Sequence, residues 1–430
     1  MAGDIPLRNK KKYDLLLCCG QVNEYLILVL NTENLPDDLY EHSFKSIEEW
    51  IIKSDTFYTN EKLLELVFNF SETKWYKQVI AIMAQAIVKS SNNKLFLNVS
   101  FSQAFQAIKP EEQRFLDSVL NYVLKSKSTF EEQLGDPESE FCKEISDLAC
   151  LLLENFEIIL FHDDQKSAEI FEFIYLILRH SSRTISLRGL EFFTDLKETL
   201  QEIRSEVKNA DFLLEPYFTA SQITMEKAKR ALFELNQNGI YEEAEESEIE
   251  NQETLSKYRD YAEDLFFSTY HIGGLLKGDE CKKHFQQIIL QRFDASQDKV
   301  EFAKNIEVAI FTTRSAIDAS DYPEDKLIEV VWDAIIGIKD FFEPTVFYGA
   351  LGFMADGSVL LPHVNHFLKD SLNYIIEGFS KYHNVKIIQG AVFRALVEIS
   401  QNGSNAFTEE TFDILLNFIE TNAALINKEN

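Results

Sequence analysis

The sequence contains little glycine and little proline, and this scarcity argues against several fold classes. Its 430 residues include 15 glycines and 8 prolines, about 5% of the chain, against roughly 12% in average proteins. Sheets with many tight turns, and enzymes that hold phosphate in glycine-rich loops, need more of both residues. The composition therefore favours an all-α protein.

Basic residues are also few relative to acidic ones. The chain has 42 lysines and arginines against 71 aspartates and glutamates, a net charge of −29, and its pI is about 4.7. Such a surface repels nucleic acid and anionic lipid and attracts basic proteins. We therefore expect no direct nucleic-acid binding. The same charge is also explained by the solubility of a large, apolar-rich chain.

No hydrophobic run has the length of a membrane span. The most apolar stretch, Leu148–Phe161, is interrupted by Glu154 and Glu157 and falls short of the roughly 18–20 residues required. The start of the chain does not resemble a signal peptide, because Lys10–Lys12 are followed by a segment with several polar residues. We expect no membrane insertion.

Cysteine is rare and odd in number, which is typical of buried reduced thiols in the cytosol or nucleus. The five cysteines lie on apolar faces of expected helices: Cys18, Cys19, Cys142, Cys150 and Cys281.

Apolar residues recur every three or four positions along the chain, which is the spacing of amphipathic helices. The spacing predicts helices near 13–30, 38–52, 63–68, 79–87, 111–126, 137–161, 163–180, 182–206, 211–236, 254–276, 278–292, 300–318, 323–342, 344–355, 359–380, 384–400 and 407–424. Consecutive helices pair into units of roughly 40–50 residues, the length of HEAT-type repeats. Because only a neighbouring pair can cover the apolar face of each pair, we expect one right-handed α-solenoid of about eight HEAT-type pairs after a leading half repeat.

Two strongly acidic segments stand out. The segment Tyr241–Glu253 has no basic residue and follows Asn238-Gly239, which we interpret as a helix stop. The region 131–170 has 12 acidic residues and two lysines. Each segment is either solvated surface or a contact for an Arg- or Lys-rich partner. The candidate contacts in the first segment are its seven glutamates: Glu242, Glu243, Glu245, Glu246, Glu248, Glu250 and Glu253.

The expected organisation follows from these patterns. It consists of a disordered basic start, a first half of the array, an acidic loop, a second half of the array and a tail, at 1–12, 13–236, 237–253, 254–425 and 426–430.

Two patterns resemble phosphate-binding or metal-binding motifs, but each lacks a residue that its motif requires. Gly273 and Gly278 resemble part of a phosphate loop, but Asp279 stands where a lysine is needed and a helix precedes them. His363 and His366 have the spacing of metal ligands, but no nearby Cys or His completes a site. We expect neither an enzyme nor a metal- or cofactor-binding protein.

A resemblance to a known family rests on several segments. The run Ser256–Phe266 resembles the helix that follows an acidic loop in the importin-β superfamily (karyopherins), in the branch that contains transportin-SR and its importin relatives. Further similar positions are core residues of other helices and one turn: Asn60–Leu64, Leu187, Phe192, Phe193, Leu196, Phe302, Ile306, Glu307, Ala309–Phe311, Ala316, Pro362, Leu368, Leu372, Tyr374, Ile375, Gly378, Ala391, Ala395 and Leu396.

The resemblance implies a nuclear transport receptor that shuttles between nucleus and cytoplasm without a cofactor. Receptors of this superfamily carry protein cargo, which transportin-SR recognises by Arg/Ser-rich segments. They bind the GTPase Ran through amino-terminal repeats and cross the pore by contacts with Phe-Gly nucleoporins. On this reading the seven glutamates contact Ran or a basic cargo segment.

The resemblance covers only the central repeats of such receptors. The amino-terminal Ran-binding repeats and the carboxy-terminal cargo repeats have no counterpart, and helix 13–30 corresponds to the second member of a pair. The hypothesis is therefore an import receptor or a shortened derivative. A Ran-independent HEAT-repeat scaffold and an export receptor are the alternatives.

Overall fold

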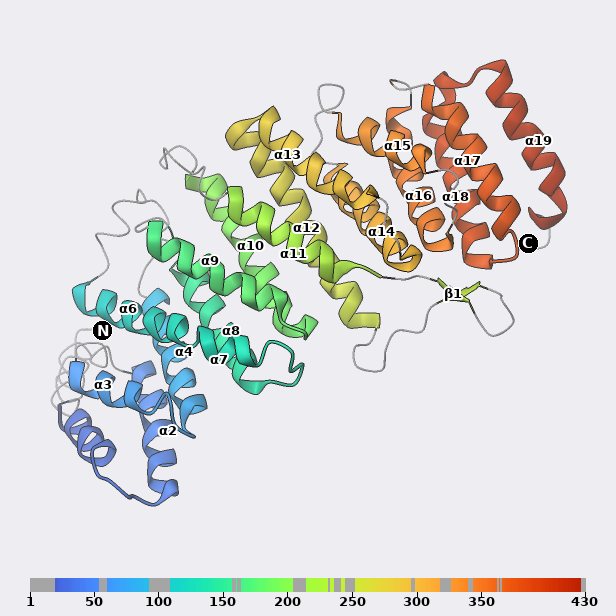
Figure 1. The fold of residues 1–430 in the computed structure, drawn as a ribbon. Helices are drawn as coiled ribbons and strands as arrows, with labels where there is room; N and C mark the ends of the chain where they lie inside the picture. The colour runs from blue at the N-terminus through green and yellow to red at the C-terminus, as the bar shows by residue number, and fades with distance from the viewer. Residues whose placement is uncertain are drawn as a thin grey trace, which may run out of the picture. The chain divides into compact units, whose positions relative to one another are not determined.

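The computed structural model describes residues 20–53, 60–92, 109–156, 160, 164–203, 214–230, 233–235, 241–243, 252–294, 298–317, 326–338, 343–361, 363 and 366–426. Within these ranges the regular elements are helical, apart from two strands of three residues each (Figure 1). The chain divides into two compact units, Met1–Lys208 and Asn209–Asn430.

Unit 1 contains two layers of helices, which follow the helical residues 20–30. Layer one consists of α2 (Asp37–Lys53), α4 (Tyr76–Asn92), α8 (Glu140–Asn155) and α10 (Arg183–Ile203), and each of these packs on the next. Layer two contains α3 (Glu61–Asn69), α6 (Pro110–Lys125), the short α7 (Lys127–Glu132) and α9 (Asp164–Arg179). In layer two, α6 and α7 both contact α9.

Unit 2 repeats this arrangement. Its layer one consists of α12 (Gln252–Lys277), α14 (Lys299–Ala316), α16 (Pro344–Asp356) and α18 (Lys386–Asn402), again packed in sequence, with α11 (Leu214–Ala228) against α12. Its layer two consists of α13 (Asp279–Leu290), α15 (Leu327–Gly337), α17 (His366–Tyr382) and α19 (Glu409–Ile426). In Figure 1 the helices from α12 to α19 are coloured from yellow to red along the chain.

The core of each unit lies between its two layers, as helical periodicity requires. In α3, for example, Leu63 and Val67 are buried and one helical turn apart. In unit 2, Trp332 of α15 is fully buried and stacks on Phe367 of α17. Its indole N–H donates a hydrogen bond to Ser371 Oγ at 2.9 Å. The prediction of an all-α HEAT-type array is therefore confirmed.

Helix starts carry the side chains that satisfy free backbone N–H groups. Asn60, Ser139 and Asp298 cap α3, α8 and α14. At α16, Glu343 Oε2 accepts hydrogen bonds from the backbone N–H groups of Thr345 and Val346 at 2.8 and 3.3 Å, and Pro344 occupies the first helical position. Partial burial raises the pKa of Glu343, and these two backbone bonds oppose the rise.

The predicted helix 211–236 is wrong at its carboxyl end. α11 ends at Ala228, and Phe233–Leu235 is instead strand β1, which pairs antiparallel with β2 (Tyr241–Glu243). In the register of this ribbon, Phe233 lies opposite Glu243. The sequence did hold a signal, since Asn-Gly is the dipeptide preferred in tight hairpins. We had interpreted Asn238-Gly239 only as a helix stop.

Two other boundaries also differ from prediction. Gly357–Leu360 forms a 3₁₀ turn and α17 begins only at His366, whereas one helix had been expected from 359. Helix α7 was not predicted, because six residues give too little periodicity to recognise.

Three expected properties concern cysteines, membrane spans and metal sites. Cys142, Cys150 and Cys281 are free thiols in the interior, as predicted, and Cys18 and Cys19 lie outside the described residues. In the part of the chain that the structure describes, none of the helices combines the length and the hydropathy needed to cross a bilayer. The same residues contain no group of three metal-ligating side chains.

Candidate protein-binding surfaces

The seven predicted glutamates are only partly placed. Glu242 and Glu243 belong to β2, and Glu253 is the second residue of α12. The other four, Glu245, Glu246, Glu248 and Glu250, lie outside the described residues. Their role as partner contacts remains a prediction, as do the expected boundaries 1–12, 13–236, 237–253, 254–425 and 426–430.

The ribbon that carries Glu242 and Glu243 is anchored on unit 2. Phe233 of β1 is 5% exposed, and its ring lies edge-on to Tyr348 of α16 with centroids 6.0 Å apart. Because Glu243 is the register partner of Phe233, the acidic strand runs past this contact. Tyr348 also lines a groove in the surface of layer one.

This groove, the α12–α16 groove, has a volume of about 540 Å³ and lies over α12, α14 and α16. Its floor contains the buried pair Arg259 and Glu307, and its rim contains the exposed acids Asp260 and Glu263. Partial burial raises the pKa of Glu263, and the charge of Arg314 opposes that rise. The groove thus combines fixed charges with the half-buried ring of Phe311.

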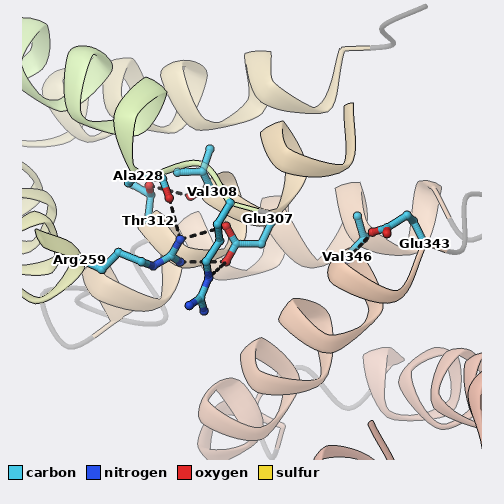
Figure 2. A network of polar contacts seen from close by, with 8 residues as sticks. Ala228, Arg259, Glu307, Val308, Thr312, Glu343 and Val346 are labelled. Atoms are coloured by element: carbon cyan, nitrogen blue, oxygen red, sulfur yellow. Dashed lines mark hydrogen bonds and ion pairs between the residues drawn. The ribbon is translucent and has the colours of Figure 1, made fainter. Parts of the chain in front are cut away.

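Figure 2 shows the ion pair at the floor of the groove. The guanidinium of Arg259 donates to Glu307 through Nη1 at 3.1 Å and Nη2 at 2.8 Å, and Nη1 also donates to the carbonyl oxygen of Ala228 at 2.8 Å. The same guanidinium lies 3.7 Å from the ring centre of Phe311. Arg230 adds a longer contact to Glu307, from Nε at 3.4 Å.

The network fixes the end of α11 to α14. Ala228 is the last residue of α11, and Glu307 lies in α14. Burial lowers the pKa of Arg259, whereas the charge of Glu307 raises it. Because bidentate Arg–carboxylate pairs hold one geometry, the backbone that leads from α11 into the ribbon has a fixed starting point.

A second charged surface lies in unit 1. We call it the α8–α10 acidic surface, and its carboxylates are Asp147, Glu154, Glu191, Asp195 and Glu198. Arg188 donates to Asp147 at 2.6 Å and to Glu191 at 2.7 Å. Among the described residues, no ion pair engages the remaining three, which are all exposed.

These carboxylates interact with one another. Partial burial raises the pKa of Glu154, and the nearby charge of Asp195 raises it further. The pKa of Asp195 is raised by partial burial and then by Glu198 and Glu191. Each ionised carboxylate therefore destabilises its neighbours, and a cation placed among them would relieve that repulsion.

Sequence reasoning found two of the five carboxylates of this surface. Asp147 and Glu154 belong to the predicted acidic region 131–170, but Glu191, Asp195 and Glu198 come from the next helix pair. Their spacing of four and three residues would have placed them on one face of helix 182–206. What the sequence did not indicate is that α10 packs on α8.

An apolar groove runs along the contact between α17 and α19. This α17–α19 groove has a volume of about 580 Å³ and is lined by Ile376, Phe379, Ile414 and Phe418, with polar residues at its edges. The rings of Phe379 and Phe418 meet edge-on at 5.2 Å. Such a groove suits an inserted aromatic side chain.

Gly278 and the pair His363 and His366 are only partly informative about the chemistry that their spacing superficially suggests. Gly278 adopts a positive φ of 65° as the cap between α12 and α13, so its role is to turn the chain. His363 is exposed, and the side chain of His366 lies outside the described part.

No family model matches the sequence, and no curated protein matches it significantly. Solved structures do match. Importin-13 in its cytosolic state superposes with a TM-score of 0.71 at 14% identity, over 98% of this chain and 48% of that one. The karyopherin Kap121p bound to Nup53p gives a TM-score of 0.63 at 16% identity, over 94% of this chain and 35% of that one.

Kap121p bound to Pho4p gives a similar result, with a TM-score of 0.60 at 16% identity, over 96% of this chain and 36% of the receptor. This chain therefore spans about half or less of the length of the receptors that it matches. At these identities the similarity concerns the fold, and it confirms the resemblance seen in the sequence at that level. The chain has the HEAT-repeat fold that importin-13 and the karyopherin Kap121p also have.

Proposed function

We propose that this protein is a nuclear import receptor, or a shortened derivative of one, which holds basic protein cargo on its acidic surfaces and shuttles between nucleus and cytoplasm. The observation that carries the proposal is the α8–α10 acidic surface on a transport-receptor fold. Its unpaired carboxylates are exposed, and two of them, Glu154 and Asp195, have pKa values raised by partial burial and by neighbouring carboxylates, so a lysine or arginine side chain would be stabilised among them.

The solved complexes of Kap121p support protein segments as ligands. That karyopherin has been determined with Nup53p, with Pho4p and with the extreme carboxyl terminus of the phosphatase Cdc14p. By analogy, we expect this chain to bind segments of other proteins, and its net charge of −29 favours basic or Arg/Ser-rich ones.

The acidic segment 241–253 provides a second contact in this proposal. Its first residues lie in the ribbon anchored on Tyr348, and its last residues lead into α12, whose Asp260 and Glu263 line the α12–α16 groove. The segment therefore begins in a ribbon that contacts one residue of the groove and ends in a helix that lines it. We expect it to contact Ran or a basic part of the cargo.

The α17–α19 groove is the proposed contact for Phe-Gly nucleoporins. Its apolar lining and its volume of about 580 Å³ fit the phenyl ring of a Phe-Gly repeat. Ile414→Lys should abolish retention on Phe-Gly beads. Ile387→Lys is the matched control, because Ile387 is 38% exposed on α18 and does not line the groove.

The cargo proposal is tested with an Arg/Ser-rich peptide and fluorescence anisotropy. The variant Glu154→Gln/Asp195→Asn/Glu198→Gln should lose three exposed ion pairs with the peptide. At about 0.5 kcal/mol for each pair, the affinity for the peptide should fall about tenfold. The control Glu169→Gln/Glu172→Gln neutralises exposed acids of α9 and should leave affinity unchanged. Equal affinity in all three proteins would remove the acidic surface from the proposal.

Neutralising the seven glutamates of 241–253 tests the acidic segment separately. Glutamine at all seven positions should flatten the dependence of peptide affinity on salt, because charges are screened over roughly 8 Å at physiological ionic strength. An unchanged salt dependence would leave the segment as solvated surface only.

Nucleotide dependence separates import from the alternatives. Ran-GTP should release the peptide from an import receptor, strengthen its binding to an export receptor, and leave a scaffold unaffected in comparison with Ran-GDP.

A further inference from the structure

A large open cleft lies in unit 1, apart from the surfaces above. This α3–α6 cleft has a volume of about 1160 Å³. It lies between α3 and α6 in layer two, and the turn after α3 and the start of α8 also contribute to it. Its volume exceeds the roughly 300–1,000 Å³ of small-molecule sites, which points to a segment of macromolecule as the occupant.

The cleft arises because neighbouring helices pack less tightly in layer two of unit 1 than in layer one. In layer one, α4 packs directly on α8. In layer two, α6 is joined to α3 by the surface ion pair of Arg114 with Glu61 and to the following turn by a hydrogen bond from Tyr122 to the carbonyl oxygen of Ser71 at 3.5 Å. Both of these contacts are polar.

The base of the cleft is apolar and half-buried. It is formed by Leu64, Phe68, Tyr76, Tyr122 and Phe141, which come from α3, α4, α6 and α8. Burial raises the pKa of Tyr122 to about 12, with added effects of Tyr76 and Glu72, so its hydroxyl stays protonated. An incoming apolar stripe could cover these side chains, of which Tyr76 and Phe141 have ring centroids 5.7 Å apart.

The walls of the cleft are acidic. Glu65, Glu72 and Glu111 line it with Lys125, and among the described residues no ion pair engages these three glutamates. An apolar base with acidic walls is complementary to a helix that has apolar residues on one face and basic residues beside them.

We propose that the α3–α6 cleft binds a basic amphipathic helix of a partner protein. The helix would lie between α3 and α6, with its apolar face on the rings and its lysines or arginines beside the three glutamates. This site is separate from the α8–α10 acidic surface, so either proposal can fail without the other.

The test uses three fluorescein-labelled peptides and anisotropy. The first has Leu and Phe on one helical face and Lys on the other, the second replaces each Lys by Gln, and the third scrambles the order of the first. Only the first should bind tightly. Equal binding of the second would overturn the basic character of the partner, and equal binding of the third would overturn its helical form.

Variants locate the site. The variant Glu65→Gln/Glu72→Gln/Glu111→Gln should bind the first peptide about tenfold more weakly. It loses three exposed ion pairs with the lysines of the peptide, at about 0.5 kcal/mol for each. Glu169→Gln/Glu172→Gln/Glu280→Gln removes the same charge from exposed positions outside the cleft and should change nothing. Equal losses in both variants would show that only net charge matters and would overturn the site.

The apolar base is tested in the same way. Leu64→Gln should weaken the first peptide, whereas Leu39→Gln, at a 45% exposed position of α2, should not. Circular dichroism of each variant confirms that it is folded. No binding of the first peptide to the folded wild-type protein would overturn the proposal outright.

Discussion

Arg259 and Glu307 form a bidentate ion pair in which both side chains are almost fully buried, at 7% and 4% exposure. If one of the two residues were replaced by a neutral one, the charge of the other would remain uncompensated in the interior of unit 2, and such a buried ion is costly. The pair therefore holds α11, α12 and α14 in one arrangement, through Ala228, Arg259 and Glu307 respectively.

Glu307→Ala should lower the free energy of unfolding by about 3–5 kcal/mol, because Arg259 would lose its buried counter-ion. Glu301→Ala is the control, since Glu301 lies on the same helix and pairs with Lys229 at a half-exposed position. Its loss should cost only about 0–1 kcal/mol. Urea denaturation measures both, and similar losses would contradict the role of burial.

Partial burial of Glu154 and Asp195, together with repulsion from the neighbouring carboxylates, should make stability depend on pH. Glu154 and Asp195 have pKa values raised above their unfolded values, so their favourable contribution is complete below the unfolded pKa, near 4, and is lost as pH rises through the folded pKa. Glu154→Gln/Asp195→Asn should therefore gain stability relative to wild type between pH 5 and 7.5. Urea midpoints at both pH values measure this difference, and a relative gain toward low pH would have the wrong sign.

Gly378 of α17 lies against the ring of Phe347 from α16, and a Cβ atom at that position would overlap the ring. Gly378→Ala should therefore destabilise unit 2 by about 1–3 kcal/mol, despite the better helix propensity of alanine. At Gly390 of α18 the same substitution meets no atom within 4 Å and should stabilise by about 0.5–1 kcal/mol. Thermal unfolding of the two variants should shift in opposite directions.

Cys150 is fully buried, and burial raises the pKa of its thiol well above the ordinary value. Since the thiolate is the reactive form, iodoacetamide should leave Cys150 unmodified in the native protein and alkylate it in urea. Peptide mass spectrometry measures both states. Rapid alkylation under native conditions would mean that α8 and α10 separate readily.

Local pattern in the sequence was sufficient for most helices. Buried positions such as Leu63 and Val67, or Phe115 and Val119, recur at the spacing of one helical turn, because each helix has one face to cover. The helices predicted near 163–180 and 407–424 likewise correspond to α9 and α19, which begin at Asp164 and Glu409. The repeat of pairs then predicted the HEAT-type array.

The sequence was insufficient to predict features that depend on contacts between segments far apart in the chain. Phe233 lies within the predicted helix 211–236 but forms a strand, and its ring packs on Tyr348, a residue more than a hundred positions away. The acidic residues of α10 join those of α8 only because the two helices pack together. The α3–α6 cleft likewise depends on the spacing between two helices of layer two, which no local pattern encodes.

The sequence by itself determined that this chain is helical, acidic and built of pairs that must stack, because helix periodicity and charge are properties of neighbouring residues. Tertiary structure decided which carboxylates face one another, which arginine is buried with its counter-ion, and where a cleft remains open. These features depend on contacts between segments far apart in the chain, and packing alone sets those contacts.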